Sequence, residues 1–149
     1  MNRIAATMSI AVAFAAGCGV THLLQPALAA GNITAQIIHT GEMEGDALGA
    51  ANKVGFRSKT FVEADGATVS IQDGQVPKHL HPNTNEVQYI LEGTGTIWLG
   101  DKEVTVKPGD LVVIPKGTPH GGTKTNGRAI KSIAIKTPPQ APDDVKLLD

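Results

Sequence analysis

The stretch KHLHPNTNEVQYILEGTG, Lys78 to Gly95, decides how the rest of the sequence is interpreted. It sets His79 and His81 either side of one leucine and places a carboxylate, Glu86, five positions later. Residues two apart in a strand share a face, so the two imidazoles are expected to point together. The PNTN segment that follows predicts a turn, which returns the chain with Glu86 at the start of the next strand.

The alternation of faces continues along that second strand. Glu86, Gln88 and Ile90 share one face, and Tyr89 belongs to the opposite one. If Glu86 faces the histidines, Gln88 lines the same cavity, where it is a candidate to orient a bound oxygen atom. Tyr89 is a weaker candidate for a supporting role at the site, and packing in the core is the favoured interpretation for it.

These side chains suggest a metal site. Two imidazoles, a carboxylate and one more nitrogen form a mixed donor set that suits a divalent transition metal such as Fe, Mn, Ni or Zn. His120, which ends the turn segment IPKGTPH, is the candidate for the missing nitrogen. Each residue also has an interpretation without a metal. His79 and His81 would lie on an exposed strand, Glu86 would be a solvated carboxylate in a turn, and His120 would cap a turn. His39 is expected only to end a strand.

The surrounding sequence predicts an all-β protein. Short runs rich in Val, Ile and Thr alternate with Gly, Pro, Asp and Asn clusters, which is typical of a sandwich or small barrel. LGDKE predicts a tight hairpin with Gly100-Asp101 as its turn. GEMEGDALGAAN is expected to be a loop, and PPQAPDD an extended tail laid over the domain. The predicted strands are 33–39, 54–62, 67–72, 86–91, 96–99, 103–106, 110–114 and 129–135.

The first thirty residues predict a signal peptide. A basic residue, an apolar run and the small-residue site Ala27-Leu28-Ala29 follow one another in that order. An uncleaved membrane anchor and a lipoprotein modified at Cys18 are the alternatives. We therefore expect residues 31–149 to be a single exported domain, periplasmic or secreted. Cys18 is the chain's only cysteine, so the mature domain would have neither a disulfide nor a thiolate ligand.

Composition excludes some partners. The chain has 149 residues, 17 of them Gly and 9 Pro, and a formal net charge of -1. Binding to nucleic acid or to an anionic membrane surface needs a basic face that this charge balance does not supply. Beyond the export signal, neither kind of partner is expected.

Two stretches of the chain resemble the cupin superfamily. The first cupin motif, G-x5-H-x-H-x3,4-E-x6-G, is matched by Gly74, His79, His81, Glu86 and Gly93, although four residues rather than five separate Gly74 from His79. The second motif, G-x5-P-x-G-x2-H-x3-N, is matched in four positions, and Lys124 stands in place of its final Asn. The matching positions are Gly109, Pro115, Gly117 and His120. The resemblance extends over about residues 67–135.

The resemblance implies a double-stranded β-helix, or jelly roll, in which His79, His81, Glu86 and His120 hold one divalent metal. It does not imply one reaction, because cupins include dioxygenases, isomerases, lyases and proteins without catalytic activity. The sequence therefore supports two hypotheses: a metal-dependent enzyme, with a dioxygenase favoured, that acts on a small molecule, and a binding module that captures a small ligand or metal. A homodimer is also expected, because an open strand edge at Ile33 to His39 would be covered by pairing.

Overall fold

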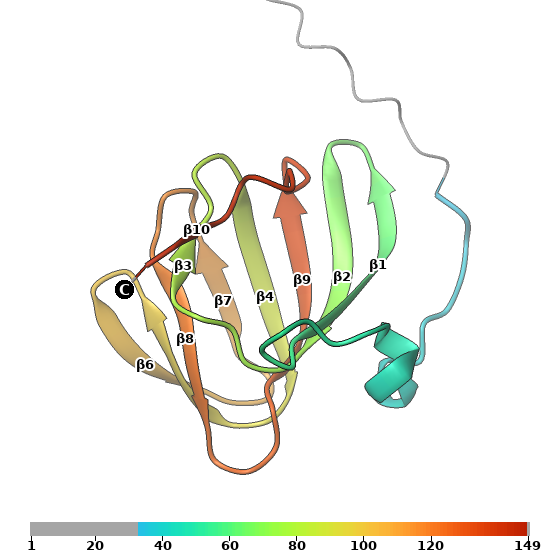
Figure 1. The fold of residues 1–149 in the computed structure, drawn as a ribbon. Coiled ribbons are helices and arrows are strands. Elements are labelled where there is room, and N and C mark those ends of the chain that lie inside the picture. Colours follow the sequence, from blue (N-terminus) through green and yellow to red (C-terminus); the bar gives the residue numbers. More distant parts are fainter. Residues whose placement is uncertain (1–32, 149) are drawn as a thin grey trace, which may run out of the picture.

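The computed structural model describes residues 33–148, which form two five-stranded antiparallel sheets (Figure 1). The sheet orders are β1-β2-β9-β4-β7 and β10-β3-β8-β5-β6. Two short 3-10 helices, η1 (Thr40–Glu42) and η2 (Gly45–Leu48), precede the strands. The strands are β1 (Arg57–Ala64), β2 (Ala67–Asp73), β3 (His79–Leu80), β4 (Asn85–Glu92), β5 (Gly95–Leu99), β6 (Lys102–Val106), β7 (Leu111–Ile114), β8 (His120–Thr125), β9 (Lys131–Thr137) and β10 (Lys146–Leu147). The all-β prediction is confirmed, and the predicted signal peptide lies outside the described residues.

Strand alternation gives the space between the sheets an apolar end and a polar end. On β4, Ile90 is 1% exposed and belongs to the apolar core, whereas Glu86 on the same face is 2% exposed and belongs to the polar end. The core packs side chains from both sheets, because residues two apart along each strand point the same way. Its buried members are Ile90, Ile97, Val106, Val112, Ile114 and Ile130.

The predicted hairpin is confirmed. Leu99 pairs with Lys102 across β5 and β6, which leaves Gly100 and Asp101 as a two-residue turn. Gly100 has a φ of +66°, a conformation that glycine adopts without steric cost. The predicted tail over residues 138–144 lies against the domain: the Asp144 carbonyl is 2.7 Å from His81 Nδ1, and Asn83 N–H donates to Asp144 Oδ1 at 2.9 Å. Beyond it, β10 pairs with β3.

Strand β8 was not among the strands predicted from the sequence, in which His120 was placed beside a turn. Glycine has low β propensity, but close packing requires it here. A Cβ on Gly121 would lie 2.6 Å from the Pro77 carbonyl oxygen, and one on Gly122 would lie 2.7 Å from Trp98 Cδ1. Pairing with β3 and β5 therefore outweighs the local propensity.

The predicted strand at Ile33 to His39 is wrong. These residues have no strand pairing, and Ile33 and Ile37 are 61% and 83% exposed. The β-branched residues suggested a strand, but strand formation also needs a neighbouring sheet edge. The edge strands of the five-stranded sheet that contains β4 are instead β1 and β7.

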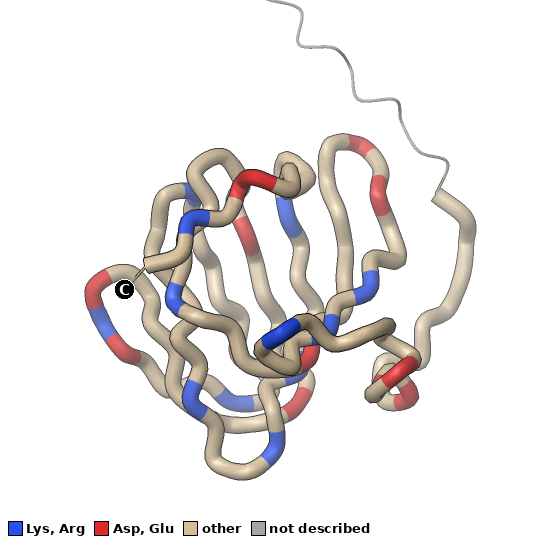
Figure 2. Tube along the Cα trace, in the orientation of Figure 1, with Lys and Arg blue, Asp and Glu red and all other residues tan. Residues whose placement is uncertain are grey.

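Charged residues are interspersed by sign along the described chain (Figure 2). The most buried is Lys131, at 0% exposure, whose ammonium lies 3.0 Å from Glu92 Oε1 at the end of β4 away from Glu86. Among residues 33–148, no helix is long and apolar enough to cross a membrane.

Candidate metal centre

Strand pairing positions the three histidines. His79 on β3 lies directly opposite His120 on β8, and His81 follows β3 after Leu80. Their rings are close neighbours, with centroid separations of 5.0 Å for His79 and His81, 4.2 Å for His79 and His120, and 5.1 Å for His81 and His120. Glu86 comes from β4 in the other sheet. The site is therefore built between the two sheets.

Each of the three histidines is oriented by a backbone carbonyl. His79 Nδ1 lies 2.8 Å from the Pro77 oxygen, and His120 Nδ1 lies 2.9 Å from the Thr118 oxygen. His81 Nδ1 lies 2.7 Å from the Asp144 oxygen in the C-terminal tail. A carbonyl oxygen only accepts, so Nδ1 must carry the hydrogen in all three rings. In their neutral form the imidazoles then present a lone pair at Nε2, which is the form that binds a metal.

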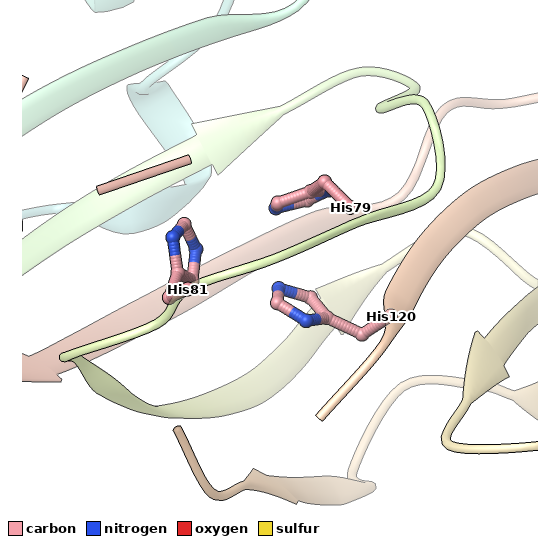
Figure 3. A group of neighbouring side chains, drawn as sticks. All are labelled: His79, His81 and His120. Atoms are coloured by element: carbon pink, nitrogen blue, oxygen red, sulfur yellow. The ribbon is translucent and has the colours of Figure 1, made fainter. Parts of the chain in front are cut away.

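The donor atoms converge on one point. One ligand atom from each histidine lies within 4.8 Å of the others, and Figure 3 shows the three rings gathered around a common space. Nε2 of His81 and of His120 is buried and has no hydrogen-bond partner. A buried polar atom without a partner is costly, so the two nitrogens indicate a ligand that the protein itself does not supply.

Glu86 completes the arrangement. Its Oε2 lies 3.2 Å from His81 Nε2 and 3.5 Å from His120 Nε2. Its Oε1 accepts a hydrogen bond of 2.9 Å from the Gln88 amide. Burial alone would raise the pKa of Glu86, but this pKa lies below its ordinary value, and the Lys136 charge and the Gln88 hydrogen bond lower it whatever the histidine tautomers. The carboxylate is therefore ionised.

The environment also keeps His79 neutral. Burial and the neighbouring His120 lower the pKa of His79 to about 4, although the hydrogen bond to the Pro77 carbonyl opposes the shift. A neutral imidazole is the state a metal ligand needs.

These residues fit a divalent metal. With hydrogen on each Nδ1, lone pairs of two imidazoles face a carboxylate oxygen across 3.2 Å and 3.5 Å, an arrangement that a cation satisfies. Three imidazole nitrogens and one carboxylate oxygen suit several first-row metals, so the donor set does not select among them.

Three of the four donors lie in the wall of a cavity of about 580 Å³. His79, His81 and Glu86 line it, together with Gln88. A volume of this size accommodates a small organic molecule. A metal held by these donors would therefore be reachable by a ligand.

The structure brings together all four residues that the sequence analysis proposed as metal ligands. Gln88 lines the cavity as expected, but its amide is engaged by Glu86. Tyr89 lies on the opposite face of β4 and is 43% exposed, so both its supporting role and its core role are wrong. Its face is the outer surface of the sheet, where the described residues provide no covering layer.

Two residues at the site were not proposed from the sequence. Lys136 on β9 lines the cavity and places its ammonium 3.7 Å from Glu86 Oε2. Its inward direction follows the same alternation as Ser132 and Ala134, but the strand was predicted to end at Ile135. Asp144 holds His81 from a distant, irregular tail, which no local sequence pattern indicates.

Comparisons with known sequences support the fold. The family model described as a cupin domain matches residues 67–132. An uncharacterized protein of Methanocaldococcus jannaschii is 34% identical over 71 residues, which is 48% of this chain and 57% of that protein. Acireductone dioxygenase 1 of Vitis vinifera is 33% identical over 63 residues, which is 39% of this chain and 33% of that enzyme. The match thus spans only a third to just over half of these relatives.

Solved structures show the same architecture. A double-stranded β-helix protein from Klebsiella pneumoniae superposes with a TM-score of 0.62 at 14% identity, covering 78% of this chain and 99% of that one. Pac13, described as a nucleoside dehydratase, gives a TM-score of 0.54 at 17% identity, covering 65% of this chain and 81% of that one. A related structure gives Streptomyces as its source. Identities this low show the fold alone. Residues 67–132 match the cupin-domain family model, and both sequence motifs fall within this part of the chain.

Proposed function

We propose that this protein is a metal-dependent enzyme that acts on a small molecule, in the dioxygenase, isomerase or lyase class. The observation that carries the proposal is the convergence of three histidines and Glu86, with His79, His81 and Glu86 in the wall of a cavity of about 580 Å³. A divalent metal bound there supplies Lewis-acid chemistry or, with a redox-active ion, oxygen chemistry at its open coordination positions.

The protein's own residues prepare the site for that ion. Backbone carbonyls fix the three histidine tautomers, so that Nε2 faces the common point. Gln88 donates to Oε1 of Glu86, and the second oxygen, Oε2, remains directed at the histidines. Fixed ligand orientation of this kind raises metal affinity and limits the geometries that the site accepts.

Two observations favour catalysis over ligand binding alone: a ligand has access to the metal donors, and one relative is named as an enzyme. The cavity leaves room for a ligand beside the donors, and a grape relative is a dioxygenase. The experiment is to incubate the metal-loaded protein with candidate small molecules, in air and without oxygen, and to follow them by mass spectrometry. Conversion that His81→Ala abolishes supports an enzyme. Binding with quantitative recovery of unchanged ligand across the screen favours the binding module.

Glu86→Gln is expected to lower metal affinity roughly tenfold or more, because a neutral amide is a poorer ligand than a carboxylate. Metal retained after dialysis against a weak chelator measures the effect. Glu42→Gln is the matched control, since Glu42 is exposed in η1 and does not line the cavity. Full metal occupancy in Glu86→Gln would show that this carboxylate is not a ligand.

Export and dimerisation also remain proposals. The N-terminal segment supports export to the periplasm or the exterior, by a signal peptide rather than a lipid or membrane anchor. The homodimer now rests on the edge strands β1 and β7, because residues 33–39 form no strand. We expect about twice the chain mass of 15.5 kDa, less any cleaved signal, in sedimentation equilibrium, and a monomer mass would refute the dimer.

A further inference from the structure

We propose that the cavity binds a small carboxylate with an apolar substituent, and that Lys136 is the residue that recognises the carboxylate. This inference rests on the proposed function and names its substrate class. The observations that carry it are the position of Lys136, the charge balance of the cavity and the apolar residues at its mouth.

Lys136 is placed to contact a ligand beside the metal donors. It lies opposite Glu86 across β9 and β4, and its side chain is only 14% exposed. Its ammonium lies 3.7 Å from Glu86 Oε2 and also donates to Gln140 Oε1. An ammonium has three hydrogens, so these two neighbours leave one available for a further acceptor.

The charge balance of the cavity favours an anion. Among the described residues, two lysines line it, Lys53 and Lys136, whereas Glu86 is the only carboxylate in its wall. When a divalent cation occupies the site, the single negative charge of Glu86 has to balance both the cation and the Lys136 ammonium. The net charge of the site is then strongly positive. A ligand that brings a negative charge to this position removes the imbalance, whereas a neutral ligand leaves it.

The walls of the cavity favour an apolar substituent on that anion. Val54 is 51% exposed, Val145 40% and Leu147 66%. These side chains come from the segment before β1 and from the C-terminal tail, and all three line the cavity. Phe56, Val76 and Pro77 extend the apolar lining between them. A ligand with a hydrocarbon portion would cover surface that now faces water.

The proposal is tested by calorimetric titration of the metal-loaded full chain with three probes: hexanoate, hexanamide and acetate. We expect hexanoate to bind roughly tenfold or more tightly than hexanamide, because a charged hydrogen bond in a part-buried site has about this effect. We also expect hexanoate to bind at least roughly tenfold more tightly than acetate, because its methylenes are buried.

Substitution of Lys136 separates the contribution of the lysine to hexanoate affinity from the contribution of the metal. Lys136→Met is expected to reduce the ratio of hexanoate to hexanamide affinity by roughly tenfold, while metal content stays at the wild-type level. Lys136→Arg should preserve the ratio, because it preserves the charge. Lys146→Met is the matched control: Lys146 is exposed on β10 and does not line the cavity.

Three results would overturn the proposal: equal affinity for acid and amide in the wild-type protein, an unchanged ratio in Lys136→Met, or loss of metal in Lys136→Met. The last would show that the lysine serves Glu86 rather than a ligand. A wild-type protein that holds no metal would instead refute the proposed function, and its titration with acid and amide would still test Lys136. Failure of one proposal is thus distinguishable from failure of the other.

Discussion

Replacing His81 with alanine is expected to reduce metal affinity by more than about 100-fold, while the two sheets stay folded. Loss of a hydrogen bond that merely supports a ligand costs about 10 to 100-fold in affinity, so loss of a ligand should cost more. His81 contributes one of three converging imidazoles, and its Nε2 is buried without a partner. Elemental analysis after dialysis measures the metal, and far-UV circular dichroism reports the fold.

His39→Ala is the matched control for that experiment, because it removes an exposed histidine that is not part of the cluster. Its metal content should equal that of the wild-type protein. An unaltered metal content in folded His81→Ala would remove His81 from the ligand set and leave its buried Nε2 unexplained.

Replacing Asp144 with alanine is expected to lower metal affinity by about 10 to 100-fold, although Asp144 is not one of the four proposed metal ligands. Its backbone carbonyl accepts from His81 Nδ1 at 2.7 Å. Its carboxylate fixes that carbonyl by accepting from the backbone and side-chain amides of Asn83, at 2.9 Å and 3.0 Å. Without these bonds the tail loosens, and His81 loses the contact that selects its tautomer.

The readout that separates this role from general stability is the tautomer itself. Nitrogen-15 chemical shifts of His81 in the metal-free protein should show the hydrogen on Nδ1 in the wild type and a mixture of tautomers in Asp144→Ala. Asp143→Ala, which removes the exposed neighbouring carboxylate, should leave both tautomer and metal affinity unchanged. A pure Nδ1 tautomer in Asp144→Ala would contradict the positioning role.

The sequence was most informative where function and local pattern coincide. His79, His81 and Glu86 lie within eight residues, and strand alternation with one intervening turn was enough to direct them to one place. The distant His120 depended on a resemblance between motifs rather than on local physics. Its strand pairing with His79 could not be derived from periodicity, because β8 begins with His120 followed by two glycines.

What the sequence did not reveal depends on packing between distant segments. The tail after Pro139 has no alternation that would indicate a contact with His81, and only the closed structure brings Asp144 there. Lys136 was missed because the predicted strand stopped one residue short. Tyr89 was assigned to the correct face of β4, but which faces of a sheet are covered depends on the second sheet, and alternation alone does not reveal it.

The most direct test of the central claim is elemental analysis of the protein, purified without a histidine tag from its native compartment. The arrangement of His79, His81, His120 and Glu86 predicts about one divalent transition-metal ion per chain. Iron would direct the substrate search toward oxygen chemistry, and manganese, nickel or zinc toward isomerisation or elimination. A folded protein that contains no metal, and takes none up when iron, manganese, nickel or zinc is added, would contradict the account.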